Sequence, residues 1–347
     1  MKIKNLKGKT LKIIISAALV LAIVGGSAAC GSSGTNSPAN SEASVNNSSS
    51  NGTNSSVNSS ESGKQVVKIA YLPLTHALPV FVENELQDKA GNNYEIELVK
   101  YGSWPELMDA LNTGHVDGAS VLIELAMKAK EQGIGVKAVA LGHKDGNVVV
   151  VSNKINDVKD LKGKPFAIPH RQSSHNILLN QMLKNAGLTI SDVKVVELPP
   201  PEMPAALASG QIEGYSVAEP FGAKSVSINS GKVLFESHEL WEDSICCSLV
   251  FTDDFLNSKR EIAEKVVANY NEAGKFITEN KDKSSDIAKK YLKLDDKVLD
   301  LSMKWISYDD LSITKGAYED LTKKVINFGI SKTPPSYEEF VDPSLLK

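Results

Sequence analysis

From residue 66 onward, short apolar runs alternate with amphipathic segments. The runs have the length and composition of buried strands, and the segments between them have the three- and four-residue apolar spacing of helices. The first set contains expected strands at 66–72, 94–101, 116–122, 136–141 and 147–152, with helices at 105–112 and 123–132. This alternation predicts mostly parallel sheets that are covered by helices on both faces.

A second set of alternating elements follows the first. Its expected strands are 166–169, 193–198, 214–218 and 233–236, and its expected helices are 173–186, 203–209 and 220–229. Residues 246–251 form a further β-like run, and the chain beyond them turns mainly helical. The sequence therefore predicts two lobes joined by crossing strands, the first made of 65–152 and 246–347 and the second of 153–245.

The N-terminal segment has the pattern of an export signal. Five lysines precede an apolar run at 13–24, and small residues at 25–29 lead to Cys30. This predicts a lipoprotein signal peptide over 1–29 and a lipid on Cys30 that anchors the protein outside the cell membrane. Ser27 stands where such signals usually carry Leu, and the alternative is ordinary cleavage with release of the protein. Residues 30–64 are rich in Ser and Asn and predict a disordered tether.

Composition narrows the function classes. The net charge of −4 is too small to indicate binding to nucleic acid. Beyond Cys30 the cysteines are the adjacent Cys246 and Cys247, so no disulfide framework is expected. We expect both thiols to be small core residues, because a metal site needs further Cys or His ligands at suitable spacing.

Polar side chains gather where the expected strands end. The junctions read Pro73-Leu74-Thr75-His76, Gly102-Ser103-Trp104-Pro105, His170-Arg171-Gln172-Ser173-Ser174-His175 and Ala218-Glu219-Pro220-Phe221. Open α/β sheets bind ligands at the carboxyl ends of their strands. Helix starts add unpaired backbone N–H groups, which suit a small anion. The junctions therefore predict a small-molecule site.

These motifs, together with Pro199-Pro200-Pro201-Glu202-Met203, occur in an order that resembles the solute-binding proteins of nitrate/sulfonate/taurine/bicarbonate ABC importers. The likeness is strongest to the nitrate- and bicarbonate-binding branch. It implies the two-lobed periplasmic-binding-protein type II fold, an α/β fold in which each lobe is a mostly parallel sheet flanked by helices, with a helical C-terminal tail. It also implies a monomer without a resident cofactor that captures a small anion and delivers it to permease and ATPase subunits.

By this resemblance, Trp104 lines the cleft, and Thr75 and His175 face the ligand from opposite lobes. His76, Arg171, Ser174 and Glu219 complete the expected ligand-binding set. The alternatives are core packing for Trp104, helix capping for the histidines, a surface ion pair for Arg171 and a hinge role for Glu219.

Two positions depart from the pattern expected for nitrate, namely acidic Glu219 and His76 after Pro-Leu-Thr. A buried carboxylate beside an anion is unfavourable unless a cation or a proton intervenes. Three solutions stay open: a metal ion accompanies the ligand, the charge comes from His76, Arg171 and His175, or the ligand is not an inorganic anion.

Other functions remain as alternatives. An aromatic vitamin precursor such as a thiamine pyrimidine would stack on Trp104, Tyr215 or Phe221 and hydrogen-bond to Glu219. A pyrimidine-synthase-like enzyme or a ligand sensor would share the fold. The chain lacks the G-x-S-x-G, H-E-x-x-H and G-x-x-x-x-G-K-[ST] motifs, so we expect a binding protein and not an enzyme.

Overall fold

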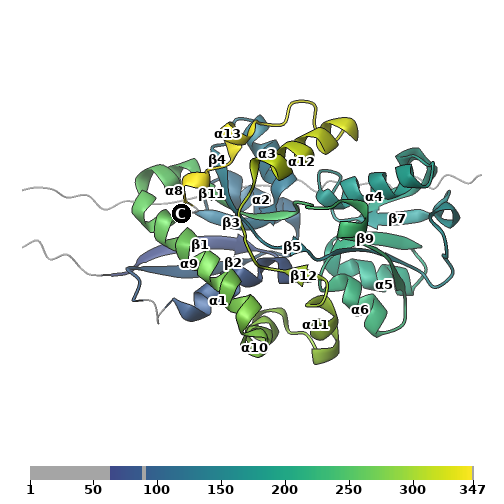
Figure 1. Ribbon diagram of the computed structural model, residues 1–347, viewed down its shortest axis with the longest axis horizontal. Coiled ribbons are helices and arrows are strands. Elements are labelled where there is room, and N and C mark those ends of the chain that lie inside the picture. The colour runs from purple at the N-terminus through teal and green to yellow at the C-terminus, as the bar shows by residue number, and fades with distance from the viewer. Residues whose placement is uncertain (1–62, 88–90, 346–347) are drawn as a thin grey trace, which may run out of the picture. The chain divides into compact units, whose positions relative to one another are not determined.

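The computed structural model describes residues 63–87 and 91–345 (Figure 1). The expected signal peptide, nearly all of the expected tether and Cys30 lie outside these residues. Among the described helices, none combines the length and the apolar character that crossing a membrane requires.

Five strands form the first sheet, in the order β2-β1-β3-β11-β4. The strands are β1 (Gln65–Tyr71), β2 (Tyr94–Lys100), β3 (Gly118–Leu122), β4 (Val136–Leu141) and β11 (Cys247–Thr252). Strand β1 pairs in parallel with β2 and β3, whereas β11 runs antiparallel to both β3 and β4. The helical segments that follow its early strands are η1 (Thr75–Ala77), α1 (Leu78–Leu86), α2 (Trp104–Asn112) and α3 (Ile123–Glu131).

The second sheet has the order β10-β6-β9-β7-β8. Its strands are β6 (Asn147–Val151), β7 (Pro165–Ile168), β8 (Lys194–Glu197), β9 (Gly214–Ala218) and β10 (Lys232–Glu236). The helices between them are η2 (Val158–Leu161), α4 (Ser174–Asn185), η3 (Ile190–Asp192), η4 (Pro200–Glu202), α5 (Met203–Ala208), α6 (Phe221–Ser227) and α7 (Ser237–Leu240). Strand β7 is parallel to β8 and β9, and β6 is the antiparallel strand.

Each sheet therefore contains one antiparallel strand that comes directly after a crossing between the sheets. The chain crosses first through residues 142–146 and returns through 237–246. Strand β6 lies in the second sheet, so this sheet begins earlier in the chain than the expected lobe boundary at residue 153. The expected alternation of strands and helices is confirmed.

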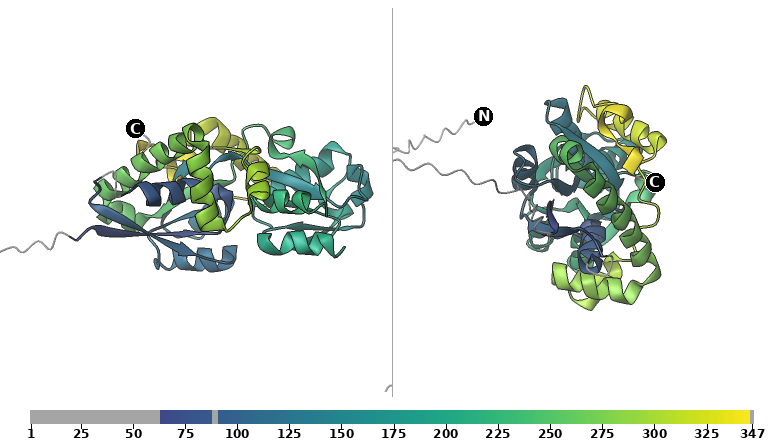
Figure 2. Two further views of the ribbon diagram at one scale, coloured as in Figure 1. Left: turned by 90° about the horizontal axis from the view of Figure 1, so that it is seen from below. Right: turned by 90° about the vertical axis from the view of Figure 1, so that its left-hand side faces the viewer.

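The remaining helical elements follow β11 in the chain; most lie around the first sheet, whereas the segment 296–302 packs against α6 of the second. They are α8 (Asp253–Ser258), α9 (Arg260–Glu279), α10 (Lys281–Leu292), α11 (Asp296–Ser302), α12 (Lys315–Asn327), α13 (Tyr337–Phe340) and η5 (Pro343–Leu345). A short pair, β5 (Lys144–Asp145) with β12 (Ile306–Ser307), joins the first crossing to this helical part. Helix α9 packs on α1 (Figure 2), and its buried face includes Val266, Tyr270 and Ala273.

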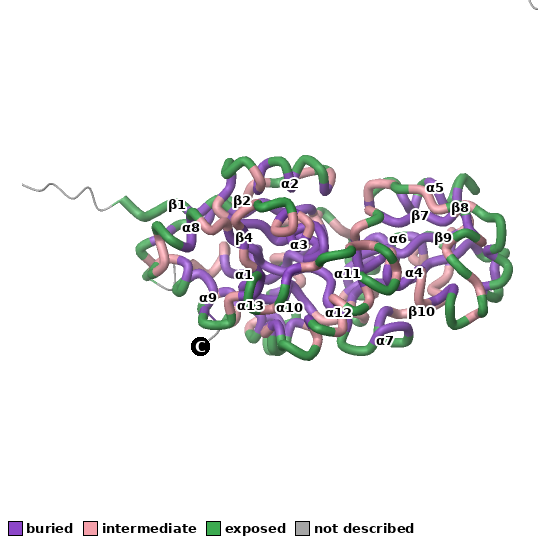
Figure 3. The backbone as a smooth tube through the Cα atoms, turned by 90° about the horizontal axis from the view of Figure 1, so that it is seen from above, coloured by how far each residue is buried: buried purple, intermediate pink, exposed green. Residues whose placement is uncertain are grey.

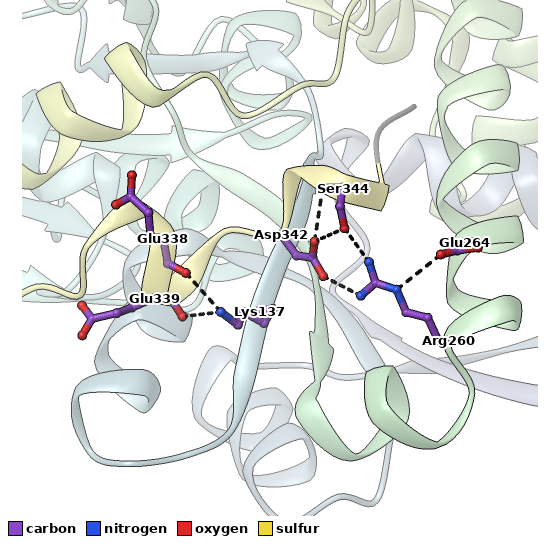
Figure 4. A network of polar contacts seen from close by, with 7 residues as sticks. All are labelled: Lys137, Arg260, Glu264, Glu338, Glu339, Asp342 and Ser344. Atoms are coloured by element: carbon purple, nitrogen blue, oxygen red, sulfur yellow. Dashed lines mark hydrogen bonds and ion pairs between the residues drawn. The ribbon is translucent and has the colours of Figure 1, made fainter.

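The core lies along the sheets. Every residue of β3, β6 and β9 is buried (Figure 3), because each of these strands has a paired strand on either side and helices packed on the sheet. The C-terminal segment is fixed to the first sheet by polar contacts (Figure 4). Arg260 donates to the Asp342 carboxylate at 2.6 Å, and Lys137 donates to the carbonyl of Glu339 at 2.7 Å.

Candidate functional site

The candidate site lies where the carboxyl ends of the parallel strands meet. Strands β1, β3 and β4 run in one direction and β11 runs against them, so the ends of these three strands lie at the same edge of the sheet as the start of β11. This edge carries His76, Glu124, His143, Cys246 and Cys247, all of which are buried.

The corresponding edge of the second sheet supplies the facing groups. It carries the loop from β7 to α4 with Ser174 and His175, and Glu219 at the end of β9. The edges touch directly, because the Thr75 N–H and hydroxyl both donate to the Glu219 carbonyl, at 3.1 and 3.0 Å. Thr75 thus holds the two edges together.

Two imidazoles and two thiols form a compact cluster within the first edge. One ligand atom from each of His76, His143, Cys246 and Cys247 lies within 4.8 Å of the others. The His76 Nδ1 lies 3.5 Å from the Cys247 sulfur and 3.8 Å from the Cys246 sulfur, and the sulfurs are 3.8 Å apart. The two imidazole rings have centroids 3.5 Å apart.

The electrostatics of this cluster reflect its burial. Burial alone would raise the pKa of the Cys246 thiol, but contacts with Cys247 and the two imidazoles outweigh it and hold that pKa well below its usual value. Burial lowers the pKa of His143, and the neighbouring His76 lowers it further. The imidazole of His143 is therefore neutral and has a lone pair available at physiological pH.

Several buried polar groups around the cluster make no hydrogen bond of good geometry. They are the carboxylate of Glu124, both ring nitrogens of His175, the side-chain nitrogen of Asn147, and the hydroxyls of Ser174, Ser216, Ser244 and Ser248. Each such group costs about 1–3 kcal/mol when it is left unpaired in a folded protein. This concentration of unpaired buried polar groups indicates a binding site for a polar ligand.

Two carboxyls and one imidazole in this region are held in their neutral forms. Burial raises the pKa of Glu219 to about 8, against the hydrogen bond that its carboxylate accepts from the Ala223 N–H. Burial also raises the pKa of Glu124 well above its usual value. Burial lowers the pKa of His175 to about 4. No Lys or Arg is among the buried residues of the described chain, so these groups have no buried cationic side chain beside them.

The remaining expected residues lie apart from the cluster. Trp104 is buried at the start of α2 and lines a groove of about 230 Å³ with Lys128, His170 and Gln172. Its indole N–H makes no hydrogen bond in the structure. Arg171 is exposed and pairs with Glu197 at 3.1 Å, which places it at the surface.

Sequence reasoning missed three of the buried polar residues. His143 follows strand β4 after a single glycine, Glu124 is the second residue after β3, and Asn147 begins β6. The criterion that selected His76 and Glu219, a polar residue in the segment that follows a strand, also applies to His143 and Glu124.

Comparisons with known proteins agree with this architecture. A Staphylococcus aureus structure, a ligand-binding component of an ABC-type import system with zinc bound, is 40% identical with a TM-score of 0.76. The match covers 81% of this chain and 97% of that one. Periplasmic binding proteins at 18% identity share the fold, so the expected two-lobed fold is confirmed.

Curated relatives are more distant. A putative aliphatic sulfonates-binding protein of Escherichia coli is 24% identical over 235 residues, which are 65% of this chain and 70% of that protein. The nitrate import ATP-binding protein NrtC of Synechocystis is 27% identical over 195 residues, 50% of this chain and 29% of that protein. The chain thus spans under a third of the length of this relative.

A family model described as NMT1-like matches residues 60–292, which is more than half of the chain. The expected resemblance to nitrate-, sulfonate- and bicarbonate-type binding proteins is therefore confirmed, and the chain belongs to the NMT1-like family.

Proposed function

We propose that this protein is the extracytoplasmic solute-binding component of an ABC importer, and that it captures a small solute between its two sheets without transforming it. The observation that carries the proposal is the pair of facing strand edges, whose buried polar side chains converge from both sheets. Ligands of open α/β sheets bind at such edges. Relatives that serve nitrate, bicarbonate and sulfonate import support the transport role.

The solute class that we propose is a small anion of the nitrate, bicarbonate or sulfonate type. Helix α4 presents its N-terminus to the site, with the Ser174 hydroxyl and His175 buried and unpaired beside it. Backbone N–H groups and the helix dipole favour an anion at this position. The unpaired indole N–H of Trp104 is a further donor.

A metal ion accompanies the solute in this proposal. The buried carboxyls of Glu124 and Glu219 face the region, and no buried Lys or Arg of the described chain balances an incoming anion. A cation would supply the missing positive charge, because it attracts the solute and favours the ionised form of both carboxyls. The zinc bound in the Staphylococcus aureus relative supports this part of the proposal.

The proposed partners and location follow from the same role. We propose delivery of the solute to permease and ATPase subunits, and a monomer that a lipid on Cys30 holds at the outer face of the membrane. Mass spectrometry of the membrane-extracted chain tests the anchor, because acylation adds the mass of lipid chains to the peptide that begins at Cys30.

Solute binding is tested by titrating the full-length chain with nitrate, bicarbonate and an alkanesulfonate, each with and without added zinc. We expect one of these anions to bind, and His175→Ala to weaken that binding about 10- to 100-fold, because a hydrogen bond to a charged group is lost. His115→Ala is the matched control, since the His115 side chain is exposed.

Two results would contradict this proposal. If none of the anions binds while a pyrimidine does, the solute class is wrong. If the purified chain converts a bound compound into a product, the protein is an enzyme and the transport role fails.

A further inference from the structure

The thiol and imidazole cluster is made by residues that lie far apart in the sequence. His76 follows β1, His143 lies on the first crossing segment, and Cys246 and Cys247 stand where the second crossing segment enters β11. All four side chains are fully buried or nearly so. Their assembly is a product of the sheet topology, since three separate strand ends have to meet to form it.

Three of the four ligand atoms lie at the separations of a tetrahedral metal site. A tetrahedral ion with the bond lengths of zinc places two sulfurs about 3.8 Å apart and a sulfur and a nitrogen about 3.6 Å apart. Here the sulfurs are 3.8 Å apart, and the His76 Nδ1 lies 3.5 and 3.8 Å from them. The His143 imidazole completes a set of two sulfurs and two nitrogens within 4.8 Å.

A neighbouring contact orients one ligand. The Nε2 of His76 lies 2.8 Å from the Gly146 carbonyl, which can only accept a hydrogen bond, so Nε2 carries the proton. The Nδ1 of His76 therefore presents its lone pair toward the two sulfurs. Metal-binding histidines usually donate their second ring nitrogen to a carbonyl or carboxylate in this way.

The ligand types indicate which ion fits. Thiolate sulfur and imidazole nitrogen select thiophilic transition metals and bind calcium and magnesium poorly, because these prefer oxygen. Two thiolates also neutralise a divalent charge, which makes its burial tolerable. A core role for the thiols alone would leave the two adjacent buried imidazoles unexplained.

We propose that His76, His143, Cys246 and Cys247 bind one thiophilic divalent metal ion, such as zinc, as part of the captured solute. The metal site rests on its own geometry, while the ion's role as cargo rests on the proposed function. With four protein ligands the ion has a closed tetrahedral shell, so it is enclosed by the protein when bound.

The test uses the full-length chain, kept reduced and stripped of metal, with zinc and cobalt as probes. We expect one equivalent of zinc to bind. Cobalt should give the intense visible absorption of a tetrahedral ion together with thiolate-to-cobalt charge-transfer absorption. Zinc should also protect Cys246 and Cys247 from alkylation, a readout that needs no variant.

Cys246→Ser and Cys247→Ser should each lower zinc affinity at least about 100-fold, since loss of even an orienting neighbour costs about 10- to 100-fold. His143→Ala should do the same, whereas the exposed His115→Ala should bind zinc as the unaltered chain does. Cobalt binding without charge-transfer absorption, alkylation that zinc does not slow, or unchanged affinity in both cysteine variants would overturn the metal site.

Zinc accumulation by cells separates the two proposals. If the metal site exists and zinc is cargo, cells with the unaltered chain should accumulate more zinc than cells with Cys246→Ser. Equal accumulation despite tight binding in solution would overturn the cargo role. Anion binding by a chain that binds no zinc would overturn the metal site and the accompanying metal ion, and would leave the anion-capture role standing.

Discussion

Glu219 illustrates how a single buried group links the site to stability. Its carboxyl is fully buried at the end of β9, and burial raises its pKa to about 8, with the charge of Glu236 adding to the effect. In the unfolded chain a glutamate titrates near its ordinary pKa. Between this pKa and the raised pKa of the folded state, the folded state binds more protons than the unfolded state does. For such a group, stability is fully present at low pH and declines as pH rises toward 8.

We therefore expect the free energy of unfolding to fall less steeply from pH 5 to pH 8 in Glu219→Gln than in the unaltered chain. The difference should reach up to about 1.4 kcal/mol per pH unit, the value of one proton. Glutamine keeps the side-chain oxygen that accepts from the Ala223 N–H. Urea unfolding at several pH values measures the slopes, and parallel slopes would show that Glu219 does not titrate in this range.

At the residue scale, sequence predicted some of the buried site and not the rest. His76, His175 and Glu219 were expected because they follow strands in motifs with family likeness, and all three are buried at the facing edges. The cysteines were expected to be core residues, because spacing along the chain cannot show that His76 and His143 lie beside them. Only the sheet topology brings residues 76, 143 and 246 together.

At the scale of the element, helix α4 depends on Ser173. The Ser173 hydroxyl accepts from the Asn176 N–H at 3.3 Å and donates to the His170 carbonyl at 2.6 Å, so it both caps the helix and fixes the preceding loop. Helix α12 has a comparable cap, because Thr314 accepts from the Ala317 N–H at 3.2 Å, but this helix lies outside the site.

We expect Ser173→Ala and Thr314→Ala each to lower the free energy of unfolding by about 1 kcal/mol, as loss of an N-cap does. Only Ser173→Ala should also weaken solute binding, because Ser174 and His175 begin the helix that it caps. Urea unfolding and calorimetric titration of both variants measure these effects. Equal solute affinity in the two variants would show that the cap does not position the site.

The elements themselves were well predicted from sequence. Buried strands and amphipathic helices have distinct periods, so β4 and β9 were expected at their observed bounds. The partner of each strand was harder to predict. The apolar run at 147–152 could be buried in either sheet, so its sequence pattern does not show that β6 belongs to the second sheet.

At the scale of the whole described fold, the second sheet lies between two parts of the first along the chain. Strand β6 completes the second sheet directly after the first crossing, and β11 completes the first sheet directly after the second. We expect residues 63–345 to unfold in one cooperative transition, because the first sheet needs β11 from beyond the second sheet and the Thr75 hydrogen bonds join the two edges. Calorimetry and circular dichroism should give coincident transitions, and two resolved transitions would contradict this expectation.

The position of β11 also restricts the order of folding. Strands β3 and β4 are synthesised early, yet they do not pair with each other. Strand β11, which ends at residue 252, lies between them in the sheet. Until that segment emerges during synthesis, both strands keep unpaired backbone edges, which attract foreign strands. The nascent chain must therefore be shielded from aggregation until nearly three-quarters of it has been translated.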